Sequence, residues 1–168
     1  MTTSKIFSAA ILSMLAVILM TTILFALDDI EEHRRCAQCG MDRKDFGFSR
    51  VLLRHDDGTT VGTCSLHCAK MQLDANPARK VKGIEVADRN TRTLIDAKKA
   101  YWVIGGDKGG VMTKTATWAF AKNEDAATYV KEHGGRLASF NESLETVTKE
   151  LPKKEGAVKM DIQGHKRH

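Results

Sequence analysis

All four cysteines of the chain lie in one short window, between Cys36 and Cys68. Cys36 and Cys39 are separated by two residues, and Cys64 and Cys68 by three. A turn with the first spacing lets two sulfurs point at one ion, and the second spacing puts two sulfurs on one face of a helix. We therefore expect the chain to fold so that the two pairs of thiols meet at one site.

Two further side chains in the window can donate to a metal ion. Met41 follows the first cysteine pair, and His67 lies inside the second. Thiolate and thioether sulfur suit Cu(I), whereas four thiolates also suit Zn(II). The residues alone favour Cu(I) only modestly, with Zn(II) as the alternative.

A disulfide framework is the other interpretation of the same cysteines. Outside the cytoplasm paired cysteines are usually oxidised, and four of them allow three connectivities. We favour a metal site because both pairs have the spacing of metal ligands. A thioredoxin-like role for Cys36 and Cys39 is disfavoured, because such a motif should follow a strand and open a helix.

An apolar segment without charged residues runs from Ile6 to Leu27. As a helix of about 33 Å it would cross a hydrocarbon core of about 30 Å. We expect an uncleaved membrane anchor. A cleaved signal peptide is the alternative, but the segment is long for one and lacks a small-x-small site before Asp28. Lys5 before the segment and acidic residues after it favour export of the rest of the chain. The expected location is a bacterial inner membrane, with a single span and the soluble domain in the periplasm.

After the anchor, turn and capping signals alternate along the chain. Asp57-Gly58 predicts a hairpin turn, and Ser65 is a plausible N-cap for the helix that follows. Later helices are expected to be capped by Asn123 and to open at Asn141 or Ser143. The pattern predicts an α+β fold of two small hairpin-plus-helix units, at about 36–90 and 91–145. The expected segments are a transmembrane anchor at 1–27, a linker at 28–35, a metal-binding domain at 36–151 and a disordered basic tail at 152–168.

Charge is spread through the soluble part of the chain. The 26 Lys and Arg residues exceed the 21 Asp and Glu residues, giving a net charge of +5. The basic residues form no stripe with interleaved aromatic residues, which is the usual signature of a nucleic-acid interface. Nucleic acid is therefore not an expected partner.

Two stretches together resemble the family of nitrous oxide reductase accessory proteins called NosL. The first is Cys36-Ala-Gln-Cys39-Gly-Met41 followed by the Asp57-Gly58 hairpin. The second is an ordered series over the later part of the chain: Ile95-Asp96-Ala97-x-x-Ala100-Tyr101-Trp-Val, Met112, Ala119-Phe120, Asp125-Ala126-Ala127-x-Tyr129 and Gly134-Gly135-x-Leu137-x-x-Phe140-x-Glu142. The cysteine pairs are also similar to metal-binding TRASH and YHS-type modules.

The resemblance implies a periplasmic copper-binding protein that assists copper-site assembly in nitrous oxide reductase. It implies a fold similar to the small units of the organomercurial lyase core, and it adds Met112 as a candidate soft ligand. The chain differs from the family pattern in the second cysteine pair and in having an anchor where a lipid attachment is common. The full set of candidate metal ligands is Cys36, Cys39, Met41, Cys64, His67, Cys68 and Met112.

The expected function is therefore that of a Cu(I) metallochaperone, not an enzyme, which delivers copper to an enzyme such as nitrous oxide reductase. The alternative is a structural zinc-binding or heavy-metal-binding interaction domain. An organomercurial-lyase-like catalyst ranks lower, because the sequence places no paired aspartate beside the cysteines.

Overall fold

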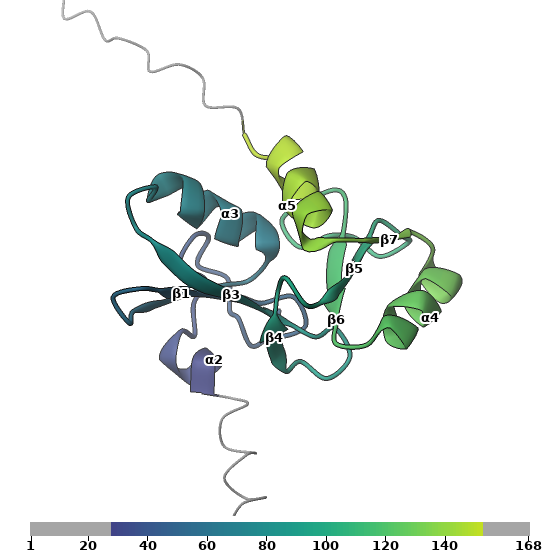
Figure 1. Cartoon of the computed structure of the whole chain (residues 1–168), viewed down its shortest axis with the longest axis horizontal. Helices are drawn as coiled ribbons and strands as arrows, with labels where there is room; N and C mark the ends of the chain where they lie inside the picture. The colour runs from purple at the N-terminus through teal and green to yellow at the C-terminus, as the bar shows by residue number, and fades with distance from the viewer. Residues whose placement is uncertain (1–27, 153–168) are drawn as a thin grey trace, which may run out of the picture.

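The computed structural model describes residues 28–152, which form two antiparallel sheets and four helices. Figure 1 shows their arrangement, with α2 and α4 far apart. In chain order the elements are α2 (Asp28–Glu32), β1 (Val51–His55), β2 (Thr60–Thr63), α3 (Leu66–Ala75), β3 (Val81–Ala87), β4 (Leu94–Asp96), β5 (Tyr101–Ile104), β6 (Thr117–Phe120), α4 (Asn123–His133), β7 (Arg136–Ala138) and α5 (Phe140–Lys149). The α+β class expected from the sequence is confirmed.

The first sheet has the strand order β2-β1-β3-β4. The hairpin predicted from Asp57-Gly58 joins β1 to β2, and Gly58 takes the positive φ of 82° that favours glycine in such a turn. Val51 and Leu53 of β1 are almost fully buried in the core. This sheet delivers the chain from β2 directly to Cys64 and the start of α3.

The second sheet has the order β6-β5-β7 and carries α4 and α5. Trp118 and Phe120 of β6 pack under α4 together with Tyr129. The helix α5 begins after Ser139, whose hydroxyl accepts from the Glu142 amide while the Glu142 carboxylate accepts from the Ser139 amide. This capping box starts α5 at Phe140, one residue before Asn141 and three before Ser143, where we expected it to open.

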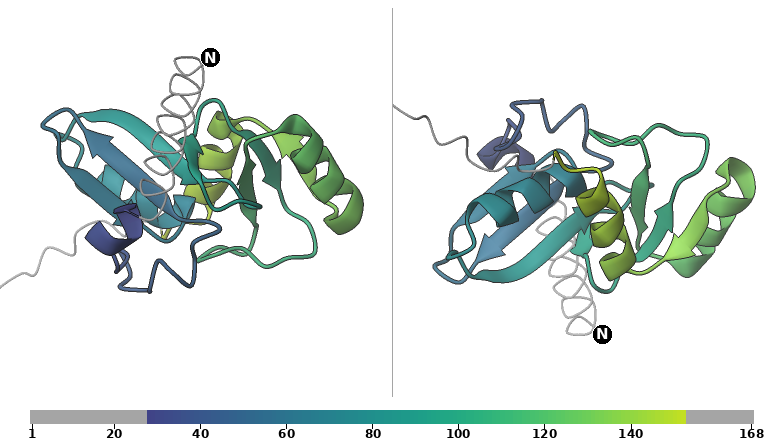
Figure 2. Two further views of the ribbon diagram at one scale, coloured as in Figure 1. Left: turned by 90° about the horizontal axis from the view of Figure 1, so that it is seen from below. Right: turned by 90° about the horizontal axis from the view of Figure 1, so that it is seen from above.

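One continuous core joins the two sheets. Val51 and Val86 of the first sheet, Trp102 of the second, Leu66 of α3 and Val147 of α5 belong to the same cluster of buried side chains. The helix α5 packs against both α3 and β5, as the views in Figure 2 also show. The two units therefore form one folded body rather than two independent ones.

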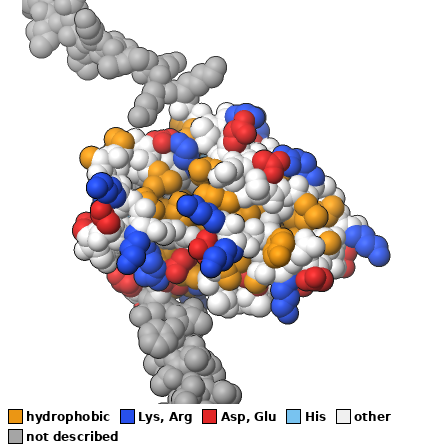
Figure 3. All heavy atoms as spheres, in the orientation of Figure 1, with side chains coloured by type: hydrophobic (Ala, Val, Ile, Leu, Met, Phe, Trp, Pro, Cys, Tyr) orange, Lys and Arg blue, Asp and Glu red, His pale blue; other side chains and the backbone are white. Residues whose placement is uncertain are grey.

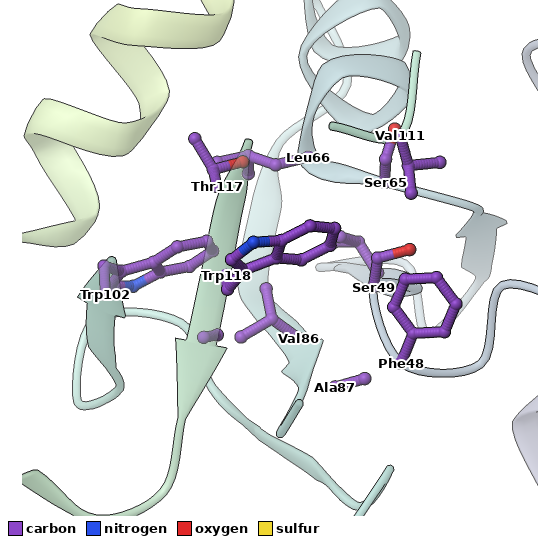
Figure 4. A pocket seen from close by; sticks show the side chains of 12 residues that line it. Phe48, Ser49, Ser65, Leu66, Val86, Ala87, Trp102, Val111, Thr117 and Trp118 are labelled. Atoms are coloured by element: carbon purple, nitrogen blue, oxygen red, sulfur yellow. The ribbon is translucent and has the colours of Figure 1, made fainter. Parts of the chain in front are cut away.

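A small cavity lies where the two sheets meet. Figure 4 shows the Trp118 side chain in it, between Leu66 of α3 and Val86 of β3. Its volume is about 10 Å³, room for about one water molecule. The cavity is therefore a packing gap and not a site for a small-molecule substrate.

The surface carries mixed charge. On the face shown in Figure 3, basic and acidic side chains are interspersed around apolar patches. This agrees with the charge pattern of the sequence and gives this face no extended basic surface.

Residues 28–35, which we expected to be a linker, are partly helical. Asp29 and Ile30 of α2 are buried. The buried Asp29 carboxylate forms ion pairs with Arg43 and Arg50. The expected anchor at 1–27 and nearly all of the expected tail at 152–168 lie outside the described residues. Within residues 28–152, none of the helices is long and apolar enough to cross a membrane.

Candidate metal centre

The first cysteine pair lies on a tight turn directly after α2. The Cys36 amide donates to the Met41 carbonyl at 2.8 Å, and the Gly40 amide donates to the Cys36 carbonyl at 2.9 Å. Gly40 has a φ of 76°, which a residue with a Cβ rarely adopts. We call residues 36–41 the knuckle. These bonds close it so that both of its cysteines face the first sheet and α3.

The second pair brackets the N-cap of α3. The Ser65 hydroxyl accepts a hydrogen bond from the Cys68 amide, which starts the helix. Cys64 therefore lies one residue before the cap. The two sulfurs do not lie along one helix face, although the spacing of the pair had suggested that they would. The extended Ser65 backbone still returns the two sulfurs to within 3.6 Å of each other.

The four sulfurs converge on one point. The Sγ atoms of Cys39 and Cys64 are 3.6 Å apart, and all four Sγ atoms lie within 4.8 Å of one another. Four sulfurs at about 2.3 Å from a shared ion would be about 3.8 Å apart along each edge of a tetrahedron. The separations of 3.6 Å are close to this edge, and the limit of 4.8 Å for all four sulfurs leaves only a small contraction around a shared ion.

The sulfurs share protons unequally. Hydrogen bonds from Cys64, and then Cys68, hold the pKa of the Cys36 thiol well below its usual range despite burial. The hydrogen bond to Cys36 raises the pKa of Cys64 to about 12, and the pKa of Cys68 is raised as well. A cation that binds the thiolates must displace the protons that remain on the cluster.

A buried ion network holds the knuckle against the sheet. The Arg43 guanidinium donates to the Asp29 carboxylate at 2.7 Å and to carbonyls of Asp29, His33, Thr63 and Val51. Arg50 donates to the same carboxylate at 2.9 Å. Burial raises the pKa of Asp29, but the hydrogen bonds and charges of Arg50 and Arg43 outweigh it and lower the pKa overall.

A glycine makes room for this network. A Cβ at Gly62 of β2 would lie 2.6 Å from the Arg43 Cζ and 2.5 Å from the His33 Cβ. The backbone of the knuckle also reaches this position, because the Ala37 amide donates to the Gly62 carbonyl at 2.9 Å. Gly62 therefore allows α2, Arg43 and the knuckle to pack on one strand.

Two polar side chains fix the cysteines from neighbouring elements. The Gln72 side chain on α3 donates to the Gln38 side-chain oxygen at 2.9 Å, which clamps the knuckle to the helix. The Ser49 hydroxyl donates to the Cys64 carbonyl at 2.8 Å. Neither these contacts nor the roles of Asp29, Arg43 and Arg50 could be expected from the sequence, because none of these residues has a local motif.

The other candidate ligands are placed differently. Met41 packs against the cysteine cluster together with Phe46 and Val111. His67 is buried but is not one of the group within 4.8 Å, since it neighbours Cys68 on α3 and adjacent helical residues face different directions. Its Nδ1 has no hydrogen-bond partner among residues 28–152, and burial lowers the pKa of its imidazole. Met112 is 47% exposed and lines a surface hollow beside Glu150.

Comparisons with known proteins agree on one family. The family model for NosL matches residues 27–148. A crystal structure of the copper chaperone NosL from Shewanella denitrificans aligns with a TM-score of 0.52 and 23% identity, over 64% of this chain and 87% of that one. A solution structure of apo-NosL from Achromobacter cycloclastes aligns with a TM-score of 0.38 and 19% identity, over 54% and 82%. No curated protein matched the chain.

Proposed function

The chain belongs to the NosL family, and from this premise we propose that it is a Cu(I)-binding metallochaperone. The observation that carries the proposal is the convergence of the four cysteine sulfurs within 4.8 Å. Thiolates are soft ligands, and Cu(I) is the soft ion among the first-row metals that such ligands select. The Met41 thioether beside the cluster adds a donor of the same kind.

The proposed role is to carry copper, not to catalyse a reaction. As the copper-receiving partner we propose a copper enzyme such as nitrous oxide reductase, because the sequence resembles the accessory proteins of that enzyme and a structural relative is described as a copper chaperone. The apolar segment from Ile6 to Leu27 supports a position at the periplasmic face of the inner membrane, where such an enzyme would be loaded. The four thiols that meet at one point supply ligands for a cargo ion.

A competition titration tests the proposal. The anaerobically reduced protein is titrated with Cu(I) against a chromophoric Cu(I) chelator, next to a variant with both Cys36→Ser and Cys39→Ser. We expect the wild type to take up one Cu(I), and the variant to bind more than about a hundredfold more weakly, because half of the thiolates are gone.

A matched control tests whether a sulfur outside the cysteine cluster contributes to copper binding. Met71 is a half-buried residue of α3 that is not among the side chains packed against the cysteine cluster. Met71→Leu should leave the affinity unchanged. A cysteine double variant that keeps full affinity while its unfolding midpoint stays that of the wild type would refute the assignment.

A structural zinc site is the second candidate. It is favoured by the deep burial of Cys64 and Cys68, because structural zinc sites are closed tetrahedra of sulfur. Metal analysis of protein purified anaerobically without added metal separates the two. Zinc that resists exchange with Cu(I) would support the structural role, whereas Cu(I) that displaces zinc supports the carrier.

A further inference from the structure

The four sulfurs are not equally accessible. Cys64 and Cys68 are 0% exposed and Cys36 is 3% exposed, whereas Cys39 is partly exposed. Among residues 28–152, the side of the site at Cys39 is therefore its most open side. An ion that arrives from outside, or a partner's ligand that comes to remove it, meets Cys39 before it meets the other three.

The shape of the knuckle produces this difference. Cys39 is at the tip of the turn, next to Gly40, and a Cβ built on Gly40 would touch nothing within 4 Å. Ala37 and Gly40 on either side are exposed. The outer side of the turn thus has room for another molecule to approach the Cys39 sulfur closely.

The opposite side of the cluster is sealed. Phe46 and Val111 pack against the buried sulfurs, and α3 begins directly behind Cys64. Since Cu(I) is satisfied by two or three soft ligands, Cys36, Cys64 and Cys68 can retain it by themselves. The fourth sulfur is then in excess of what retention needs.

We propose that Cys39 is the exchange ligand of this site, through which the metal is loaded and released. The inference rests on the proposed carrier function. On release, a thiolate or thioether sulfur of the partner first bonds to the copper, and the bond between copper and the Cys39 Sγ then breaks. Copper stays Cu(I) throughout, and the freed Cys39 thiolate takes a proton from water. The three buried sulfurs give up the ion afterwards, as the partner supplies further ligands.

Rates and affinities of single variants test this. Each cysteine is changed to Ser in the full chain, and both the Cu(I) affinity and the rate of copper removal by excess chromophoric chelator are measured under reducing conditions. Cys39→Ser should slow both loading and removal by at least about tenfold, because the ion is then held only by buried sulfurs. Its affinity should fall less than that of the other three variants.

The variants at the buried positions should behave in the opposite way. Cys64→Ser and Cys68→Ser should lose affinity and release copper faster than the wild type. Ala37→Ser is the matched control, because it changes an exposed residue of the same turn without touching a sulfur. Its rates should equal those of the wild type. A Cys39→Ser variant that exchanges copper as fast as the wild type, or faster, would overturn the proposal.

The two proposals fail in different ways. If the wild type does not bind Cu(I), the carrier function is wrong, and the same rates measured with Zn(II) still decide whether Cys39 controls exchange. If Cu(I) binds and the Cys39→Ser rates match the wild type, only the exchange role is wrong.

Discussion

The two ends of the molecule are stabilised in different ways. Beneath α4, the interior consists of aromatic and aliphatic side chains such as Phe120 and Tyr129, whose rings are 5.3 Å apart. Around the knuckle, the interior consists of thiols and of the Asp29 carboxylate between two buried arginines. The first region is stabilised mainly by the exclusion of water, with one polar contribution from the Arg89 guanidinium 4.5 Å from the Trp118 ring, whereas the second needs every polar partner in place. The metal-binding end should therefore be the one whose stability responds to charge, pH and metal.

The largest expected effect is in the aromatic region. Phe120 is 0% exposed, so Phe120→Ala should lower the free energy of unfolding by about 4 kcal/mol through lost burial and a cavity. Urea unfolding followed by tryptophan fluorescence measures the change. The loss should be the same with and without bound metal. If the Cu(I)-loaded variant were as stable as the Cu(I)-loaded wild type, the two ends would not be distinct.

The next effect is in the ion network. Arg43→Met should lower the free energy of unfolding by about 3 kcal/mol. It removes the buried ion pair between Arg43 and Asp29 and leaves four backbone carbonyls without the hydrogen bonds that Arg43 donates. The control is Arg34→Met, which removes an exposed ion pair with Asp42 and should lower the free energy of unfolding far less, because solvent screens an exposed pair. Equal costs for the two arginines would contradict the distinction between buried and exposed pairs.

Acid should weaken the same network. The pKa of Asp29 is lowered from 3.8 on folding, so the stability that it contributes is present above pH 3.8 and is lost as the pH falls further toward the folded value. As the pH falls below 3.8, the unfolding midpoint of the wild type should fall more steeply than that of Asp29→Asn. If the unfolding midpoints of the two proteins changed in parallel with pH, the pKa of Asp29 would be the same in the folded and unfolded states.

The smallest expected loss of stability is at α5, the helix that packs against both α3 and β5. Ser139→Ala removes one half of the capping box at the start of α5 and should cost about 1 kcal/mol. Metal affinity should not change, since Ser139 lies far along the chain from the cysteine window and has no contact with the cluster. A weaker copper affinity in this variant would show that α5 transmits its stability to the site.

What the sequence predicted depended on local signals. The Asp57-Gly58 turn and the Ser65 cap lie within a few residues of the structures they specify, and both are confirmed. The start of α5 was misplaced, although Ser139 and Glu142 have the spacing of a capping box. That signal was present in the sequence and was overlooked.

The burial of the charged residues could not be predicted. Asp29 meets Arg43 and Arg50 across 14 and 21 residues of chain, and no periodicity marks such a pairing. Charged residues are ordinarily exposed, so residues 28–35 were expected to be a linker. The place of His67 and Met112 relative to the sulfurs likewise depends on the packing of α3 and of the loop after Gly110, which ligand spacing does not specify.

The central claim is that one soft metal ion is held by the cysteine sulfurs that the knuckle and α3 bring together. X-ray absorption at the copper edge tests it most directly, on the reduced protein loaded with one equivalent of Cu(I). We predict only sulfur neighbours around the copper ion in the wild type, and no loss of a nitrogen neighbour in His67→Ala, because His67 is not one of the converging group. A first shell that contains nitrogen or oxygen, or one that Cys64→Ser leaves unchanged, would contradict the account.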